Sequence, residues 1–216
     1  MLRRGAVVVL LAVLMPATVQ AFDHHHHSSH HGSSSGGGCG SSSSASSSAS
    51  PSATPSPASA SHKLVFVTST QYSGALGSVK AADGYCQQSA AAAGISGVFH
   101  AWISDGTTNA YDRTGDVGPW YTTSGELAFS QKAELRTGSP ATDLLDEHGG
   151  PPADAAAWTG TDPTGVASGH DCEAWTNATS NATATTGSAL ALDPTWGGDD
   201  TASPCDGKAP LICFQQ

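Results

Sequence analysis

Apolar and polar positions follow different patterns in three parts of the chain. An apolar run over residues 6–15 is followed, at 32–61, by a stretch made only of Ser, Gly, Ala, Pro and Thr apart from Cys39. Only from Lys63 onward do apolar residues recur with the spacing of regular secondary structure. We therefore expect one folded domain over 63–216, because about 150 residues suit a single hydrophobic core.

Within this domain the pattern predicts a strand, one long helix and then many short strands. The strand is expected over 63–70. The helix is expected over 78–93, with one apolar stripe, Ser78 as N-cap and Gly94 as the stop. Gly, Pro, Asp and Asn then separate short strands expected around 101–104, 120–123, 156–161, 172–176, 189–192 and 211–214. This order predicts an α+β domain with a loop-rich second half.

Residues 1–21 have the layout of a cleavable export signal. Arg3 and Arg4 precede the apolar run, and Pro16 and small residues lead to Ala21. The run is too short to span a bilayer, and no later stretch is apolar enough for a membrane anchor. We expect a secreted or cell-surface protein, with an N-terminal core helix as the alternative interpretation of this segment.

Residues 22–62 have the composition of a disordered tail. Cys39, the odd cysteine, is either free or forms an intermolecular disulfide, and we favour the disulfide. The tail begins with a histidine tract, and imidazole is a good ligand for zinc, copper or nickel. A low-complexity tract or a cloning tag is the alternative to a metal-binding segment. The histidines are His24, His25, His26, His27, His30 and His31.

Charge and cysteines narrow the function of the domain. Residues 63–216 hold six bases and seventeen acids, a net charge of −11, which argues against nucleic-acid partners because these need a basic face. The four domain cysteines match no CxxC or Cys/His zinc pattern. In an exported protein we expect two disulfides, with three pairings open. The cysteines are Cys86, Cys172, Cys205 and Cys213.

Several sequence blocks, in a fixed order, carry a resemblance to a known family. They are Ala-Asp-Gly-Tyr-Cys-Gln-Gln (82–88), Gly-Ile-Ser-Gly-Val-Phe-His-Ala-Trp-Ile-Ser (94–104), Trp-Thr-Gly-Thr-Asp-Pro-Thr-Gly (158–165), Asp-Cys-Glu-Ala-Trp (171–175), Ser-Pro-Cys (203–205) and Leu-Ile-Cys-Phe (211–214). The domain resembles the endostatin domain of multiplexin collagens and lectin-like domains of unknown function in secreted bacterial proteins. Both have the C-type-lectin-like fold. The resemblance implies the nested disulfides Cys86–Cys213 and Cys172–Cys205.

The same resemblance raises the question of a calcium site. Sugar-binding C-type lectins hold calcium with Glu-Pro-Asn, a second Glu and Trp-Asn-Asp at fixed offsets from their cysteines. At the corresponding positions this chain has Asp162, Thr164 and His170, and Asp199 and Asp200 follow Trp196. Thr164 is a poorer ligand than Asn, and neutral His170 has no oxygen to offer. We favour a loop in which Asp and Gly residues make turns, expect no required cofactor, and keep a degenerate calcium or ligand loop as the alternative.

Two further properties of the endostatin relatives are compared with this chain. They bind heparan sulfate through arginines, but Arg113 and Arg136 are the only arginines of this acidic domain, so we expect negligible heparin affinity. They bind zinc through N-terminal histidines, to which the histidine tract corresponds in type rather than in position. Asn177 and Asn181 lie in glycosylation sequons.

The five tryptophans are candidates for either the core or a sugar-stacking face. We expect Trp102, Trp158 and Trp175 inside the domain. If a tryptophan is exposed for binding, we expect Trp196 or Trp120, because each is flanked by Gly or Pro.

No catalytic motif is recognisable, and the acidic cluster around 143–148 is interpreted as a solvated loop rather than an acid/base or metal site. The predicted function is non-catalytic binding or adhesion to a protein or glycan through the loops between Trp158 and Pro204. The alternative is an exported metal-binding protein that uses its histidine tract.

Overall fold

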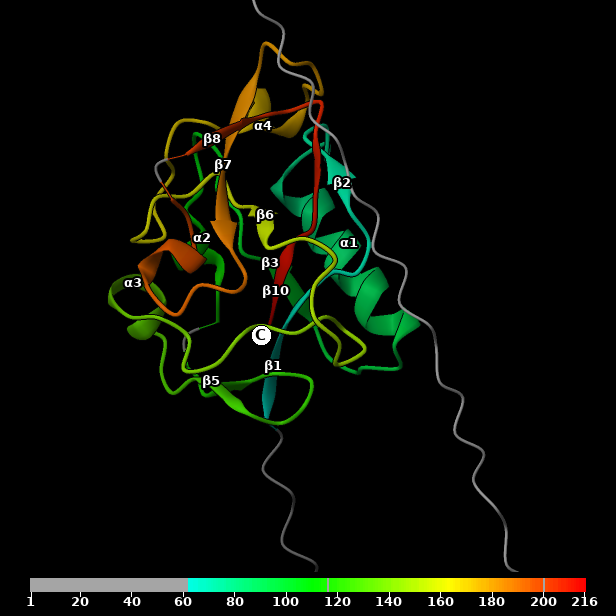
Figure 1. Ribbon diagram of the computed structural model, residues 1–216, viewed down its shortest axis with the longest axis vertical. Coiled ribbons are helices and arrows are strands. Elements are labelled where there is room, and N and C mark those ends of the chain that lie inside the picture. The colour runs from blue at the N-terminus through cyan, green and yellow to red at the C-terminus, as the bar shows by residue number, and fades with distance from the viewer. Residues whose placement is uncertain (1–61, 116, 200) are drawn as a thin grey trace, which may run out of the picture. The chain divides into compact units, whose positions relative to one another are not determined.

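The computed structural model describes residues 62–115, 117–199 and 201–216. The chain divides into two units, Met1–Thr54 and Pro55–Gln216, and all described residues belong to the second. They form the predicted mixed α+β domain, and the loop-rich half carries little regular structure (Figure 1).

A five-stranded sheet forms the centre of the domain. The first and last strands, β1 and β10, are antiparallel neighbours within it, and β1 is parallel to β4 on its other side. In spatial order the strands are β3 (Phe99–Ala101), β10 (Ile212–Gln215), β1 (Lys63–Val67), β4 (Trp120–Tyr121) and β5 (Leu127–Phe129).

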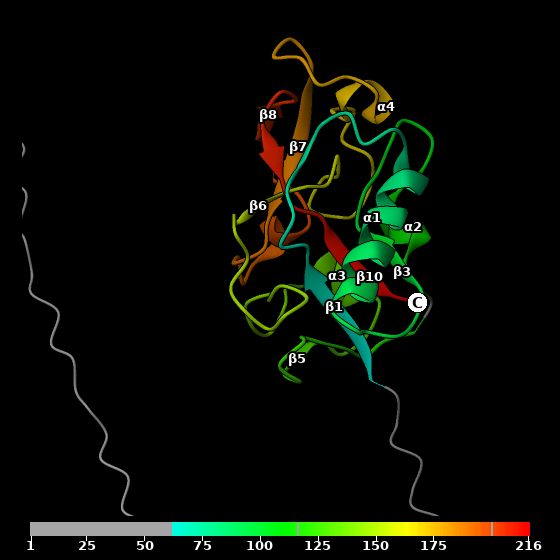
Figure 2. The ribbon, with the colours of Figure 1, turned by 90° about the vertical axis from the view of Figure 1, so that its right-hand side faces the viewer.

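Two smaller antiparallel sheets complete the β structure. One has three strands in chain order, β6 (Ala156–Trp158), β7 (Thr183–Ser188) and β8 (Ala202–Pro204), and the other pairs β2 (Tyr72–Ser73) with β9 (Lys208–Ala209). In Figures 1 and 2, β7 lies toward the end of the domain opposite β5.

The predicted long helix is confirmed as α1 (Val79–Ala92). The Ser78 side chain accepts a hydrogen bond from the Ala81 N–H, and Gly94 follows the helix with a φ of +73°, a conformation that favours glycine. The helix packs against β3 and β10 (Figure 2). Three single-turn helices, α2 (Ala110–Arg113), α3 (Glu134–Thr137) and α4 (Cys172–Trp175), and the 3-10 turn η1 (Pro194–Trp196) lie in the connections.

Buried side chains fill both faces of the central sheet. Along β1, Phe66 belongs to the cluster beneath α1, whereas Val65 and Val67 belong to a second cluster on the other face, as the period of two in a strand requires. Along β10, Cys213 and Phe214 divide between the clusters in the same way.

All five tryptophans are buried, so the expectation of an exposed Trp196 or Trp120 for ligand stacking is wrong. The ring centroids of Trp196 and Trp102 lie 4.9 Å apart, and the Trp120 indole N–H donates to the Gln215 carbonyl. Gly197 beside Trp196 allows close packing rather than exposure, because a Cβ there would lie 3.1 Å from the Trp102 indole nitrogen.

Two disulfides staple the domain in the nested order that the resemblance implied. Cys86–Cys213 joins α1 to β10, and Cys172–Cys205 joins α4 to the residue after β8. Both are intramolecular, and all four cysteines are buried. The two links tie the long helix and the loop-rich half to the C-terminal segment.

The expected short strands are confirmed at β4, β6 and β10. The strand expected at 101–104 is found earlier in the chain as β3, and the two ranges share only Ala101. Two expectations are wrong. Residues 172–176 contain the turn α4, and 189–192 form a turn after β7. The missed strand β7 has the sequence Thr-Ala-Thr-Thr-Gly-Ser, whose hydroxyl-rich composition resembles a loop although its central residues are buried.

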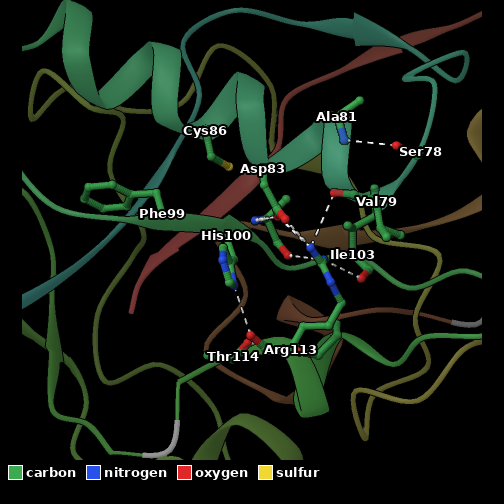
Figure 3. Close-up of polar contacts among 12 residues, drawn as sticks. Ser78, Val79, Ala81, Asp83, Cys86, Phe99, His100, Ile103, Arg113 and Thr114 are labelled. Carbon is green, nitrogen blue, oxygen red and sulfur yellow. Dashed lines mark hydrogen bonds and ion pairs between the residues drawn. The ribbon is translucent and has the colours of Figure 1, made fainter.

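A partly buried ion pair fixes α1 to the elements beside it (Figure 3). The Arg113 guanidinium donates from Nη2 to both carboxylate oxygens of Asp83 at 2.6 Å and from Nη1 to the carbonyls of Ala101 and Ile103. The Ala101 N–H donates to Asp83 Oδ1 at 2.9 Å. This Asp83–Arg113 clamp connects α1, β3 and α2. It is stabilising because its charges are paired and its polar atoms are hydrogen-bonded.

We expect Arg113→Met to lower the free energy of unfolding by about 3 kcal/mol, because it leaves the Asp83 carboxylate partly buried without its partner. The value is at the lower end for buried pairs, since 12% of the Arg113 and 20% of the Asp83 side chain remain exposed. Urea denaturation measures the change. The matched control Arg136→Met removes a partly exposed arginine stacked on Tyr111 and should cost below about 1 kcal/mol. Equal losses in the two variants would contradict the role of the clamp.

Candidate functional site

A polar hollow of about 330 Å³ opens in the loop-rich half of the domain. We call it the loop hollow. It brings together three of the residues singled out in the sequence, Asp162, His170 and Asp199, which come from the loop after β6 and the segment after η1. Its lining is Asp162, Ala167, Ser168, His170, Thr185 and Asp199.

Asp162 lies at the start of a tight turn that forms one wall of the loop hollow. Its Oδ1 accepts hydrogen bonds from the N–H and the hydroxyl of Thr164, both at 2.8 Å, and from the Val166 N–H at 3.0 Å. Thr164 is exposed and does not line the hollow. One carboxylate oxygen of Asp162 is therefore occupied by turn formation.

Asp199 is held close to this wall by the backbone. Its N–H donates to the Thr186 carbonyl on β7, and its Oδ1 accepts from the Thr201 N–H at 2.8 Å. A Cβ on the preceding Gly198 would lie 1.9 Å from the Thr161 carbonyl oxygen. Glycine is thus required where the two walls of the loop hollow meet.

His170 and Ser168 are attached to the strand β7. The Thr185 N–H donates to the His170 carbonyl at 3.0 Å, and the Thr185 hydroxyl donates to Ser168 Oγ at 2.7 Å. The His170 ring contacts the Thr183 hydroxyl through Nδ1 at 3.1 Å. The imidazole therefore pairs with Thr183 rather than with Ser168, and the hollow contains no Ser–His pair suited to nucleophilic catalysis.

The segment after His170 has an uncommon backbone conformation. All four residues of α4, Cys172 to Trp175, have φ between 52° and 63°, which is a left-handed turn built without glycine. Such a conformation costs about 1–2 kcal/mol per residue. The Trp175 N–H donates to the Asp171 carbonyl, and the Thr176 N–H to the Cys172 carbonyl, so the turn is internally hydrogen-bonded.

Four attachments to the rest of the domain hold this left-handed turn. They are the Cys172–Cys205 disulfide, the bond from the Trp175 indole N–H to the Ser104 carbonyl, the bond from the Gly77 N–H to the Trp175 carbonyl, and the bond from the Gly106 N–H to Asp171 Oδ2. Held in this way, the left-handed turn fixes the position of His170.

Asp105 carries a negative charge beside this turn. Burial raises the pKa of the Asp105 carboxyl, but hydrogen bonds donated by Thr107 and Thr108 outweigh burial, so the pKa lies below its ordinary value. Asp105 therefore stays ionised at neutral pH and keeps the loop beside Gly106 in place.

No group of three or more His, Cys, Asp or Glu residues suited to a metal ion occurs in the described part of the chain. The loop hollow collects Asp162, His170 and Asp199 without forming such a group, and Asp200 lies outside the described residues. The histidine tract and Cys39 lie outside them as well, as do the predicted export signal and all of the tail before His62.

Sequence reasoning missed part of the lining. Thr185 belongs to β7, which was not predicted, and Ser168 and Ala167 carry no recognisable motif. Their role follows only from the pairing of β7 with its neighbours, which local patterns do not reveal.

A second hollow of about 260 Å³ lies at β6 to β9, with Asp154, Trp158 and Lys208 among its residues.

No protein-family model matches this chain, and no curated protein matches it either. Among the described residues, no helix has the length and apolar character needed to cross a membrane.

We expect Ala174→Gly to stabilise the protein by about 1 kcal/mol, because glycine removes the Cβ strain at a φ of 54° and loses only part of that gain to chain entropy. The thermal midpoint should rise by about 2–4 °C. The same substitution at Ala91, an exposed position in α1, should destabilise by up to about 1 kcal/mol. A lower midpoint for Ala174→Gly would show that the left-handed turn carries no such strain.

Proposed function

We propose that this chain is an exported, non-catalytic binding module that recognises a protein or glycan ligand at the cell surface or in the extracellular space. Its domain is a C-type-lectin-like domain of the endostatin-like branch. The nested disulfides support this assignment, as do the pairing of the first strand with the last and the long helix that follows the first strand. Two intramolecular disulfides are also consistent with an extracellular protein.

The loop hollow is the observation that carries the proposal. It lies in the same loops that the resemblance associates with ligand binding, and its walls are held by β7, the left-handed turn and the contact at Gly198. A preformed site loses little entropy on binding. Its carboxylates, hydroxyls and imidazole provide donors and acceptors for the hydroxyl groups of a sugar, which favours a glycan as the ligand.

A glycan array probed with the full chain tests this function. We expect binding to a restricted set of glycans, and the double variant His170→Ala/Asp199→Ala should weaken it at least about tenfold, because two polar contacts are lost. Chelation of calcium should leave binding unchanged.

Asp143→Ala is the control for this experiment. Asp143 is an exposed carboxylate that lies outside the loop hollow. Its removal should leave glycan binding unchanged. Undiminished binding by the double variant would contradict the loop hollow as the site, and a chain that binds neither glycans nor extracellular proteins would contradict the function.

We propose metal binding by the histidine tract as a second function. Six histidines between residues 24 and 31 can gather around one ion, and N-terminal histidines of this type bind zinc in the relatives that the domain resembles. In equilibrium dialysis at neutral pH, the full chain should take up at least one zinc or copper ion. A variant with these six histidines changed to serine should take up none. Absence of uptake by the unchanged chain would refute this second function.

A further inference from the structure

A third hollow, of about 450 Å³, lies against the C-terminal half of α1, and we call it the helix hollow. The segment between β1 and β2 and the turn around 146–149 form its other walls. It shares no residue with the loop hollow. The residues that matter for its chemistry are Ser69, Tyr72, Gln88, Ser89, Glu147 and His148.

Glu147 places a buried carboxylate at this hollow. Only 4% of its side chain is exposed. Its Oε2 accepts a hydrogen bond from the Ser69 N–H at 2.7 Å, and its Oε1 accepts from the Ser69 hydroxyl at 2.6 Å. The Val67 N–H donates to the Leu145 carbonyl, which attaches the glutamate-bearing segment to the end of β1. The carboxylate is therefore fixed in position by the central sheet.

The negative charge of Glu147 is not balanced by an arginine, as the charge of Asp83 is. Asp83 has the Arg113 guanidinium at 2.6 Å, whereas among the described residues no Lys or Arg forms an ion pair with Glu147. The cationic candidate beside it is His148, whose Nε2 lies 3.9 Å from Oε1 and whose side chain is 60% exposed. A buried carboxylate without a counter-ion is costly, so a cation entering the helix hollow gains a strong partner.

Tyr72 gives the hollow an aromatic and hydroxyl surface. Its ring stacks on Tyr85 at 4.4 Å between centroids, which fixes its orientation. Burial raises the pKa of the Tyr72 phenol and the negative charge of Glu147 adds to this, while a hydrogen bond with Ser89 opposes it. The phenol thus stays neutral and lies within the electrostatic reach of the carboxylate.

The lining distinguishes between kinds of cation. Metal ions require several ligands, and no group of three His, Cys, Asp or Glu residues that could hold one occurs in the described residues. A guanidinium binds best as a fork across the edge that joins the two carboxylate oxygens, but at Glu147 this edge faces Ser69, which donates to both oxygens. An ammonium group is compact and needs only one free acceptor position on the carboxylate, while hydroxyl oxygens nearby can accept its other protons.

We propose that the helix hollow binds a ligand through its primary ammonium group, with Glu147 as the counter-ion. The volume exceeds that of an ammonium group and has room for a sugar ring or a short alkyl chain, since sites for small molecules begin near about 300 Å³. The net charge of −11 over residues 63–216 favours the approach of such a ligand. The ammonium group belongs to an amino sugar, a diamine or a lysine side chain.

Titration of the full chain with three pairs of probes, followed by NMR and calorimetry, tests the proposal and separates these sources. The pairs are glucosamine and N-acetylglucosamine, cadaverine and 1,5-pentanediol, and a blocked lysine tripeptide and its acetyl-lysine form. At least one ammonium probe should bind about tenfold or more tightly than its neutral counterpart and shift the signals of Tyr72 and Ser89. The pair in which the ammonium probe binds more tightly shows whether the ammonium group comes from an amino sugar, a diamine or a lysine side chain. Equal affinity within all three pairs would overturn the proposal.

Variants locate the binding. Glu147→Gln keeps the shape of the side chain and removes its charge, so the preference for the ammonium probe should fall at least about tenfold. Glu126→Gln, at an exposed glutamate outside the helix hollow, should leave it unchanged. Ala92→Phe places a ring at an exposed position on the rim, does not disturb the core, and should block binding even if Glu147→Gln fails to fold. Undiminished binding by a folded Glu147→Gln variant or by Ala92→Phe would overturn the proposal.

Discussion

The attachment of α1 to the central sheet is the constraint on which the rest of the domain depends. The helix is held at its middle by two different links, the Asp83–Arg113 clamp and the Cys86–Cys213 disulfide. Its position then determines both hollows. The C-terminal half of α1 forms a wall of the helix hollow, and Gly77, just before its N-terminus, binds the carbonyl of Trp175 in the left-handed turn that positions His170. Displacement of this one helix would alter the loop hollow and the helix hollow together.

The sequence predicted those elements whose signals are local. The apolar stripe of α1, its Ser78 cap and Gly94 specify a helix without reference to the rest of the fold, and β1 and β10 are apolar on both faces because both are buried. The disulfide pairing came from the resemblance rather than from spacing. The errors occurred where distant contacts decide the structure. Threonine-rich β7 is a strand because it lies between β6 and β8, and Trp196 is buried against Trp102, whose indole passes close to the adjacent Gly197. For the same reason the sequence could identify Asp162, His170 and Asp199 but not Thr185.

The acidic side chains serve three different purposes in this domain. Asp162, Asp199 and Asp105 accept hydrogen bonds from nearby backbone groups and hold turns, as short acidic side chains do in many loops. Asp83 is neutralised by an arginine and contributes to packing. Glu147 belongs to neither group, because it is more deeply buried than Asp83 and lacks a cationic partner of that strength. The acidic composition alone therefore does not reveal that the surroundings of Glu147 differ from those of the other carboxylates.

The pairing of β1 with β10 brings the two ends of the described domain together, with Val65 opposite Phe214 and the Leu64 N–H bonded to the Gln215 side chain. A mechanical load applied between these ends would separate the two strands one hydrogen bond at a time, as a zipper opens, rather than shear them along their length. Separation would begin at Gln215 and reach Cys213 within a few residues. There the bond to Cys86 would carry the load and shield the chain between Cys86 and Cys213, whereas the segment before Cys86 could still be drawn out of the sheet.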